Sequence, residues 1–102
     1  MKEYNKLVRD NILNIIKTNG QEYNFHIASD LEYWIKLKEK LYEEINEFMK
    51  DESIEEIADI FEVLLSILKY KNISISDLEN IRQNKENKLG SFNKRIILEN
   101  VY

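Results

Sequence analysis

The chain has 102 residues with no cysteine, no proline and two glycines, and it is 43% hydrophobic and 33% charged with a net charge of −4. This length fits a single domain over residues 1–102 with one modest core, and the lack of cysteine excludes disulfides and thiolate metal sites. The acidic balance argues against a nucleic-acid-binding surface, because phosphate backbones bind basic faces.

The N-terminus lacks the apolar core of a signal peptide, and no apolar run approaches the roughly 20 residues that a membrane span needs. The absence of cysteine is compatible with a reducing compartment. We therefore expect a soluble, cytoplasmic protein with no membrane partner.

The N-terminal part of the chain predicts one helix and one short strand. The helix begins near Asp10, an N-cap residue type, and ends at Asn19-Gly20, which favour a left-handed cap. Residues Tyr23 to Ala28 alternate apolar and polar side chains, as in a half-buried strand. Its natural partner is Phe92 to Leu98, and the resulting two-stranded β ribbon needs helices or a second subunit to support it.

Two longer helices follow, from Ser29 to about Lys50 and from Ser53 to about Tyr70. Each opens with a serine followed three residues later by a glutamate, the signature of a capping box. Both carry apolar residues at helical spacing, and the second is so apolar that it is either central or packed against another subunit. The stripe on the first helix contains Trp34, Leu37, Leu41, Ile45 and Phe48, and that on the second contains Ile57, Ile60, Phe61, Leu64, Ile67 and Leu68.

A fourth helix is predicted from about Asp77 to Lys88, opened by Ser76 with Glu79 and stopped by Gly90. Basic residues gather around its end, namely Arg82, Lys85, Lys88, Lys94 and Arg95. The expected fold is therefore mainly α, a four-helix bundle with a small two-stranded β ribbon, assembled as an oligomer.

Charge is strongly segregated along the chain. Residues 30–62 hold 12 of the 19 acidic residues but only four lysines, so this segment carries −8 and the remainder +4. An acidic pocket flanked by basic ends suits a magnesium-dependent enzyme that acts on a phosphorylated substrate.

Four carboxylates are the candidate metal ligands. Glu44 and Glu47 lie three residues apart on one helix, and Glu56 and Asp59 do so on the next, so a tight antiparallel turn brings all four to one place. Such clustered anions repel one another and need a cation, and an all-oxygen set favours Mg²⁺ or Mn²⁺. The alternative is that these residues belong to solvated helix faces and that Glu56 merely caps its helix.

The single histidine and the single tryptophan are weaker candidates. His26 lies on the first predicted strand, where a lone histidine is more often a packing or surface residue than a catalytic one. Trp34 lies on an apolar stripe, which favours core packing over stacking on a nucleobase.

Three motifs together resemble the MazG-like superfamily of all-α nucleoside triphosphate pyrophosphohydrolases, in its phosphoribosyl-ATP pyrophosphohydrolase-like branch. These are Lys6-Leu7-Val8-Arg9-Asp10, the acidic pairs Glu44-x-x-Glu47 and Glu56-x-x-Asp59, and Gly90-Ser91-Phe92-x-Lys94-Arg95-Ile96. The resemblance covers nearly the whole chain.

The resemblance implies Mg²⁺-dependent cleavage between the α and β phosphates of a nucleotide, with release of a monophosphate and pyrophosphate. It implies that Glu44, Glu47, Glu56 and Asp59 bind the metal, with Glu47, or next Glu44, as the general base. The residues in the family's basic positions, which we expect to bind phosphate, are Lys6, Arg9, Lys85, Lys88, Lys94 and Arg95.

The expected partners are a nucleotide substrate and further copies of the chain, as a homodimer or homotetramer. Two other functions stay open from the sequence. One is the phosphoribosyl-ATP reaction of histidine biosynthesis, and the other is a non-catalytic helical module whose acidic hairpin binds a basic partner.

Overall fold

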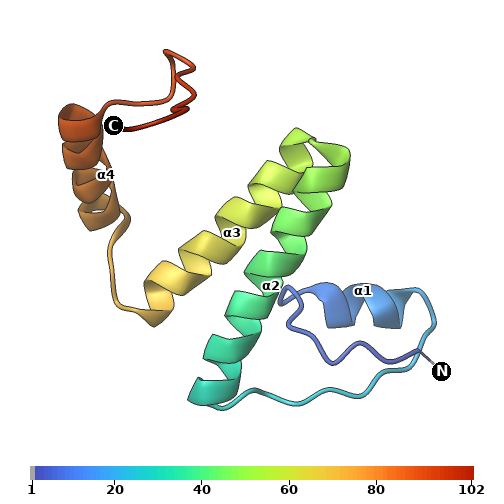
Figure 1. Cartoon of the computed structure of the whole chain (residues 1–102). Coiled ribbons are helices and arrows are strands. Elements are labelled where there is room, and N and C mark those ends of the chain that lie inside the picture. The colour runs from blue at the N-terminus through green and yellow to red at the C-terminus, as the bar shows by residue number, and fades with distance from the viewer. Residues whose placement is uncertain (1) are drawn as a thin grey trace.

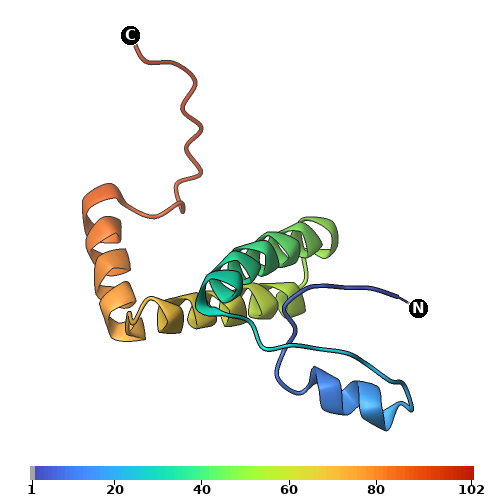
Figure 2. The same ribbon diagram turned by 90° about the horizontal axis from the view of Figure 1, so that it is seen from below.

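The computed structural model describes residues 2–102, and this part of the chain contains four α-helices (Figure 1). Helix α1 spans Ile12–Thr18, α2 Asp30–Asp51, α3 Ile54–Tyr70 and α4 Ile75–Leu89. Helices α2 and α3 lie side by side as an antiparallel hairpin, and α1 and α4 lie on opposite sides of it (Figures 1 and 2). The prediction of a mainly α protein with four helices is confirmed.

Serine caps mark the starts of both hairpin helices, and a left-handed residue lies in the turn between them. The Ser29 hydroxyl accepts a hydrogen bond from the Glu32 N–H at 3.3 Å, and the Ser53 hydroxyl accepts one from the Glu56 N–H at 3.3 Å. Glu52, between the two helices, takes the left-handed conformation with φ of 54°. Only residues 52 and 53 separate α2 from α3, so the relative rotation of the two helices is tightly fixed.

Helix α1 is shorter than predicted. It begins after Asn11 rather than at Asp10, and the Asn11 side chain makes no capping hydrogen bond. Its end follows the prediction, because Gly20 takes a positive φ of 77° and donates its N–H to the Lys17 carbonyl at 3.0 Å.

Helix α4 begins two residues before the predicted start at Asp77. Its cap is Ser74 instead of Ser76, and the Ser74 hydroxyl accepts from the Asp77 N–H at 3.0 Å. Both serines are followed by an acidic residue at the third position, so the capping pattern alone does not choose between them. The helix ends before Gly90, as predicted.

The predicted β ribbon is wrong for the chain as described. Residues 23–28 and 92–98 form no strand within residues 2–102 and lie far apart, one before α2 and the other after α4 (Figures 1 and 2). Their apolar residues Phe25, Ile27, Phe92 and Ile97 are exposed. An alternating pattern predicts that one face of a segment is buried. A strand also needs a neighbouring strand to pair its backbone N–H and C=O groups, and these two segments do not pair with each other.

The helices pack in one pair rather than as a four-helix bundle. Within residues 2–102, α2 and α3 form the extended helix contact, and α4 stands clear of the hairpin (Figure 2). Leu37 on α2 is the most buried residue, with 1% of its surface exposed, and Val63 on α3 is also buried.

Aromatic rings close the end of the hairpin opposite the turn. Trp34 on α2 stacks on Tyr70 of α3 with ring centroids 4.9 Å apart and planes inclined by 10°. Lys38 and Lys71 hold their ammonium groups 5.2 and 5.3 Å from the Trp34 ring. Because Trp34 is engaged in this contact between the helices, the packing interpretation fits it better than stacking on a base.

The chain is extended for its length. Its radius of gyration is 18.2 Å, compared with about 13 Å for a compact domain of this size. Among the described residues, no helix combines the length and apolar character that crossing a bilayer requires.

We expect Leu37→Ala to lower the free energy of unfolding by about 2–5 kcal/mol, because it opens a cavity in the well-packed contact between α2 and α3. Urea denaturation followed by circular dichroism measures this loss. Leu31→Ala is the matched control, since Leu31 lies on the same helix with 69% of its surface exposed. Equal losses from the two variants would contradict the location of the core.

Candidate metal centre

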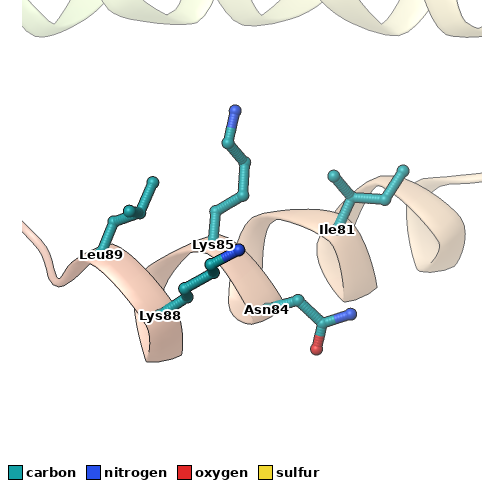
Figure 3. A pocket seen from close by; sticks show the side chains of 5 residues that line it. All are labelled: Ile81, Asn84, Lys85, Lys88 and Leu89. Atoms are coloured by element: carbon teal, nitrogen blue, oxygen red, sulfur yellow. The ribbon is translucent and has the colours of Figure 1, made fainter.

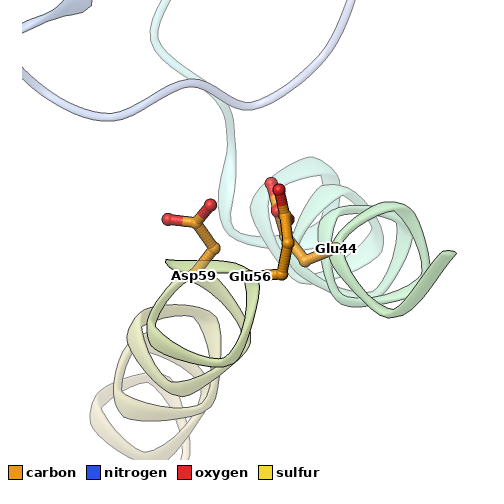
Figure 4. Close-up of side chains that lie close together, drawn as sticks. All are labelled: Glu44, Glu56 and Asp59. Atoms are coloured by element: carbon orange, nitrogen blue, oxygen red, sulfur yellow. The ribbon is translucent and has the colours of Figure 1, made fainter. Parts of the chain in front are cut away.

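The hairpin brings carboxylates from α2 and α3 together next to the turn. Glu44, Glu56 and Asp59 each offer an oxygen within 4.8 Å of the others, and Glu47, Asp51 and Glu56 form a second such group. Figure 4 shows the first three side chains converging, Glu44 from α2 and the other two from α3. The structure therefore brings together all four predicted metal ligands in two groups that share Glu56.

Glu56 is the central and least satisfied of these carboxylates. Its Oε2 atom is shielded from solvent and has no hydrogen-bond partner within residues 2–102. Desolvation raises the pKa of Glu56, and repulsion from Asp59, Glu44, Asp51 and Glu47 raises it further. A carboxylate oxygen that is shielded from solvent and has no partner is unfavourable while the group is ionised, so a nearby cation would stabilise the ionised form.

Glu44 is the most buried of the group, with 9% of its surface exposed. Its partner is Lys40, one helical turn earlier, whose Nζ lies 3.3 Å from the Glu44 Oε1. The Lys40 side chain is itself only 17% exposed, so solvent screens this ion pair less than the others near the site.

The five carboxylates of the two groups form the acidic cluster, namely Glu44, Glu47, Asp51, Glu56 and Asp59. The N-terminal segment places two further cations beside it. Arg9 donates to the Oδ1 of Asp59 at 2.8 Å, and Lys6 donates to the Oε1 of Glu43 at 2.9 Å. The hydrogen bond from Lys6 raises the pKa of that lysine. Burial acts to raise the pKa of Glu43, but its hydrogen bond to Lys6 and the charge of Lys40 outweigh burial and lower the pKa.

The other predicted phosphate-binding residues lie elsewhere. Lys85 and Lys88 line an open hollow on α4 together with Ile81, Asn84 and Leu89 (Figure 3). Lys94 and Arg95 belong to the segment that leaves α4 and runs away from the hairpin (Figure 2). A single chain thus brings Lys6 and Arg9 to the carboxylates but leaves the four C-terminal cations apart from them.

Three residues of this neighbourhood are not among the predicted ligands. Lys40 could have been found from the sequence, because a spacing of four residues places it beside Glu44. From helical geometry Glu43 is expected to point away, yet its side chain contacts the N-terminal segment, which the periodicity of α2 cannot reveal. Asp51 is the last residue of α2 instead of part of the turn.

His26 takes no part in the acidic cluster. Its Nε2 lies 2.9 Å from the Oε1 of Glu32, at the start of α2, and the side chain is largely exposed. This position agrees with the expectation that His26 is a surface residue.

No family model, curated protein or solved structure matches this chain. The chemistry of the centre therefore rests on its own geometry. Its donors are all carboxylate oxygens, the set that hard cations prefer, and it contains no sulfur or imidazole donor of the kind that zinc favours. With the Oε2 of Glu56 at its middle, which has no partner within residues 2–102, this donor set could hold a hard metal ion.

The raised pKa of Glu56 gives a pH dependence of definite sign. Its folded-state pKa lies above the ordinary 4.5, so the folded chain binds this proton more readily than the unfolded chain. As pH rises from the ordinary to the raised pKa, Glu56 therefore lowers the stability of the metal-free protein.

Glu56→Gln should abolish this contribution and raise the melting temperature of the metal-free protein at pH 7 by a few degrees. Thermal denaturation in chelator at several pH values measures both effects. Glu62→Gln, the same change at an exposed site on the same helix, should melt like the wild type. Destabilisation by Glu56→Gln at neutral pH would contradict the repulsion described here.

Proposed function

We propose that this protein is a Mg²⁺-dependent nucleoside triphosphate pyrophosphohydrolase of the MazG-like superfamily, in the phosphoribosyl-ATP pyrophosphohydrolase-like branch. It cleaves between the α and β phosphates and releases a monophosphate and pyrophosphate. The observation that carries the proposal is the convergence of carboxylates from α2 and α3 around the buried, unpartnered oxygen of Glu56.

Glu44, Glu47, Glu56 and Asp59 are the residues that would hold the metal. When bound, Mg²⁺ supplies polarisation of the attacked phosphoryl group and neutralises the charge that develops on it. Glu47 is the better general base, because Glu44 is nearly buried and already paired with Lys40, whereas Glu47 is more accessible and forms no ion pair within residues 2–102. Its carboxylate would orient the attacking water and accept its proton.

Lys6 and Arg9 are the cations best placed to bind substrate phosphates, because they already lie against the acidic cluster. The guanidinium group of Arg9 can donate two parallel hydrogen bonds to a phosphate, and the Lys6 ammonium acts as a point charge. Lys85, Lys88, Lys94 and Arg95 could reach such a site only in an assembly or after a rearrangement of α4.

Pyrophosphate release from a panel of standard, deoxy and damaged nucleoside triphosphates and phosphoribosyl-ATP, with Mg²⁺ and with chelator, tests this function. We expect release that depends on Mg²⁺, and the preferred substrate separates a nucleotide-pool role from the histidine-pathway reaction. No release across the panel, together with no thermal shift on adding Mg²⁺, would favour the module that binds a basic partner through the acidic segment 30–62.

Glu47→Gln should lower the rate of pyrophosphate release by about a hundredfold or more, because it removes the proposed base with little change in shape. Single-turnover kinetics at saturating nucleotide measure the chemical step. The matched control is Glu62→Gln, which makes the same chemical change outside the cluster and should keep the wild-type rate. An unchanged rate for Glu47→Gln would remove this residue from the mechanism.

We propose in addition that the functional form contains at least two copies of the chain. A compact monomer of 12.3 kDa exposes about 6,100 Å², whereas this chain exposes 9622 Å². The excess, about 3,500 Å² for one chain, is more than the roughly 1,000–2,500 Å² that each partner of an obligate homodimer buries, so one chain exposes enough surface for such an interface.

Exposed apolar residues on two helices support this proposal, and we expect a second copy to pack on them. Helix α3 exposes Ile54, Ile57 and Phe61, and α4 exposes Ile75 and Ile81. A second copy fits better than an unrelated partner, because the acidic segment 30–62 and the basic remainder give each chain both of the charges that a complementary contact needs.

Sedimentation equilibrium should give a mass at least about twice that of one chain. Phe61→Glu should reduce it to that of one chain, because Phe61 is 57% exposed on α3 and a buried carboxylate there would be unpaired. Ile15→Glu, on α1 at the other side of the hairpin, should leave the mass unchanged. A monomeric wild type would contradict the assembly.

A further inference from the structure

The N-terminal residues 5–9, hereafter the strap, lie across the hairpin at the acidic cluster. The strap is held by three contacts to residues of α2 and α3. Lys36 on α2 donates to the Asn5 carbonyl at 2.8 Å, Lys6 pairs with Glu43 at 2.9 Å and Arg9 pairs with Asp59 at 2.8 Å. Figure 4 shows the chain passing over the side of the hairpin on which the carboxylates converge.

The three contacts differ in what they touch. Those made by Asn5 and Lys6 go to residues outside the first metal-binding group, whereas Arg9 binds a member of that group, Asp59. The guanidinium of Arg9 donates to one of the two carboxylate oxygens of Asp59, a residue that would also be a metal ligand. Arg9 and a cation therefore compete for the same carboxylate.

The contact between Arg9 and Asp59 is the one most easily exchanged. The Arg9 side chain is 56% exposed, and an ion pair so open to solvent contributes little to stability. Lys40 is different, because its pair with Glu44 is largely shielded from solvent. With Asn5 and Lys6 holding the strap, Arg9 can leave Asp59 by a change of its own side chain.

We propose that Arg9 is an exchangeable counterion, which holds Asp59 in the metal-free protein, gives up this carboxylate to Mg²⁺ and is thereby freed to bind the nucleotide phosphates. This inference rests on the proposed function, and it adds a coupling between the two ligands. Because metal binding releases the phosphate-binding group, Mg²⁺ and nucleotide each strengthen the binding of the other.

Calorimetric titration with Mg²⁺ in the absence of nucleotide tests the competition. Arg9→Gln should tighten Mg²⁺ binding about two- to fivefold, since the variant no longer has to break the ion pair. Lys6→Gln is the matched control, because it makes the same charge change on the same strap but removes a contact to Glu43. It should tighten Mg²⁺ binding less than Arg9→Gln does.

The second arm uses an α,β-methylene nucleoside triphosphate, which cannot be cleaved at the proposed bond. In saturating Mg²⁺, Arg9→Gln should weaken its binding about tenfold, because a charge-assisted contact to phosphate is lost. Opposite effects of one substitution on the two ligands are the signature of exchange. A residue that merely supports the fold would shift both affinities in the same direction.

Side-chain NMR of arginine gives a direct view of the exchange. The chain has three arginines, Arg9, Arg82 and Arg95, and Arg82 is an internal reference because it pairs with Glu79 and Glu86 inside α4. Adding Mg²⁺ should move the Nε–H signal of Arg9 and leave that of Arg82 in place.

The outcomes separate this inference from the proposed function. Mg²⁺ binding to the wild type with no gain in Arg9→Gln, or with equal gains in Arg9→Gln and Lys6→Gln, would overturn the exchange and leave the pyrophosphohydrolase proposal standing. No Mg²⁺ binding to the wild type, with no pyrophosphate release, would overturn both.

Discussion

Repulsion between carboxylates on α2 and α3 is the constraint on which the arrangement around the hairpin depends. Oxygens of Glu44, Glu56 and Asp59 lie within 4.8 Å of one another, and ionised groups at such distances are stable together only when cations offset them. Lys40 offsets Glu44 from within α2, and Arg9 offsets Asp59 from the strap. Glu56 has neither, and its shielded oxygen is where the remaining negative charge is concentrated. Within residues 2–102, the cations of the protein therefore offset Glu44 and Asp59 but not Glu56.

Features specified by neighbouring residues could be predicted from the sequence, and features specified by distant ones could not. Helix α3 ends at Tyr70 as expected, and the two acidic pairs meet because a spacing of three residues and a tight turn suffice to align them. The prediction of a β ribbon was wrong because the alternation of apolar and polar residues describes a single segment and does not identify the strand that would pair with it. The placement of Lys85 is equally non-local, since it depends on where α4 lies relative to the hairpin, and no pattern within α4 contains that information.

The division between hairpin and flanking elements has an energetic counterpart. The hairpin holds the buried Leu37 and the stacked pair Trp34 and Tyr70, whereas α4 and the C-terminal segment bury little apolar surface in one chain. A helix of 15 residues with so little packing is marginal alone. The acidic cluster thus lies on the most firmly packed part of the chain. Helix α4 and the C-terminal segment, which have the least packing of their own, are the parts that a second copy would affect most.

The number of residues in the turn formed by Glu52 and Ser53 determines whether the carboxylates of α2 and α3 face one another. Because each residue of an α-helix advances the side chains by about 100°, one residue added at this turn would rotate the acidic flank of α3 away from Glu44 while leaving every helix intact. A residue added in the connection before α2 or in the one after α3 would not rotate α2 and α3 relative to each other. Insertions and deletions in this protein should therefore be tolerated at those connections and excluded from the hairpin turn.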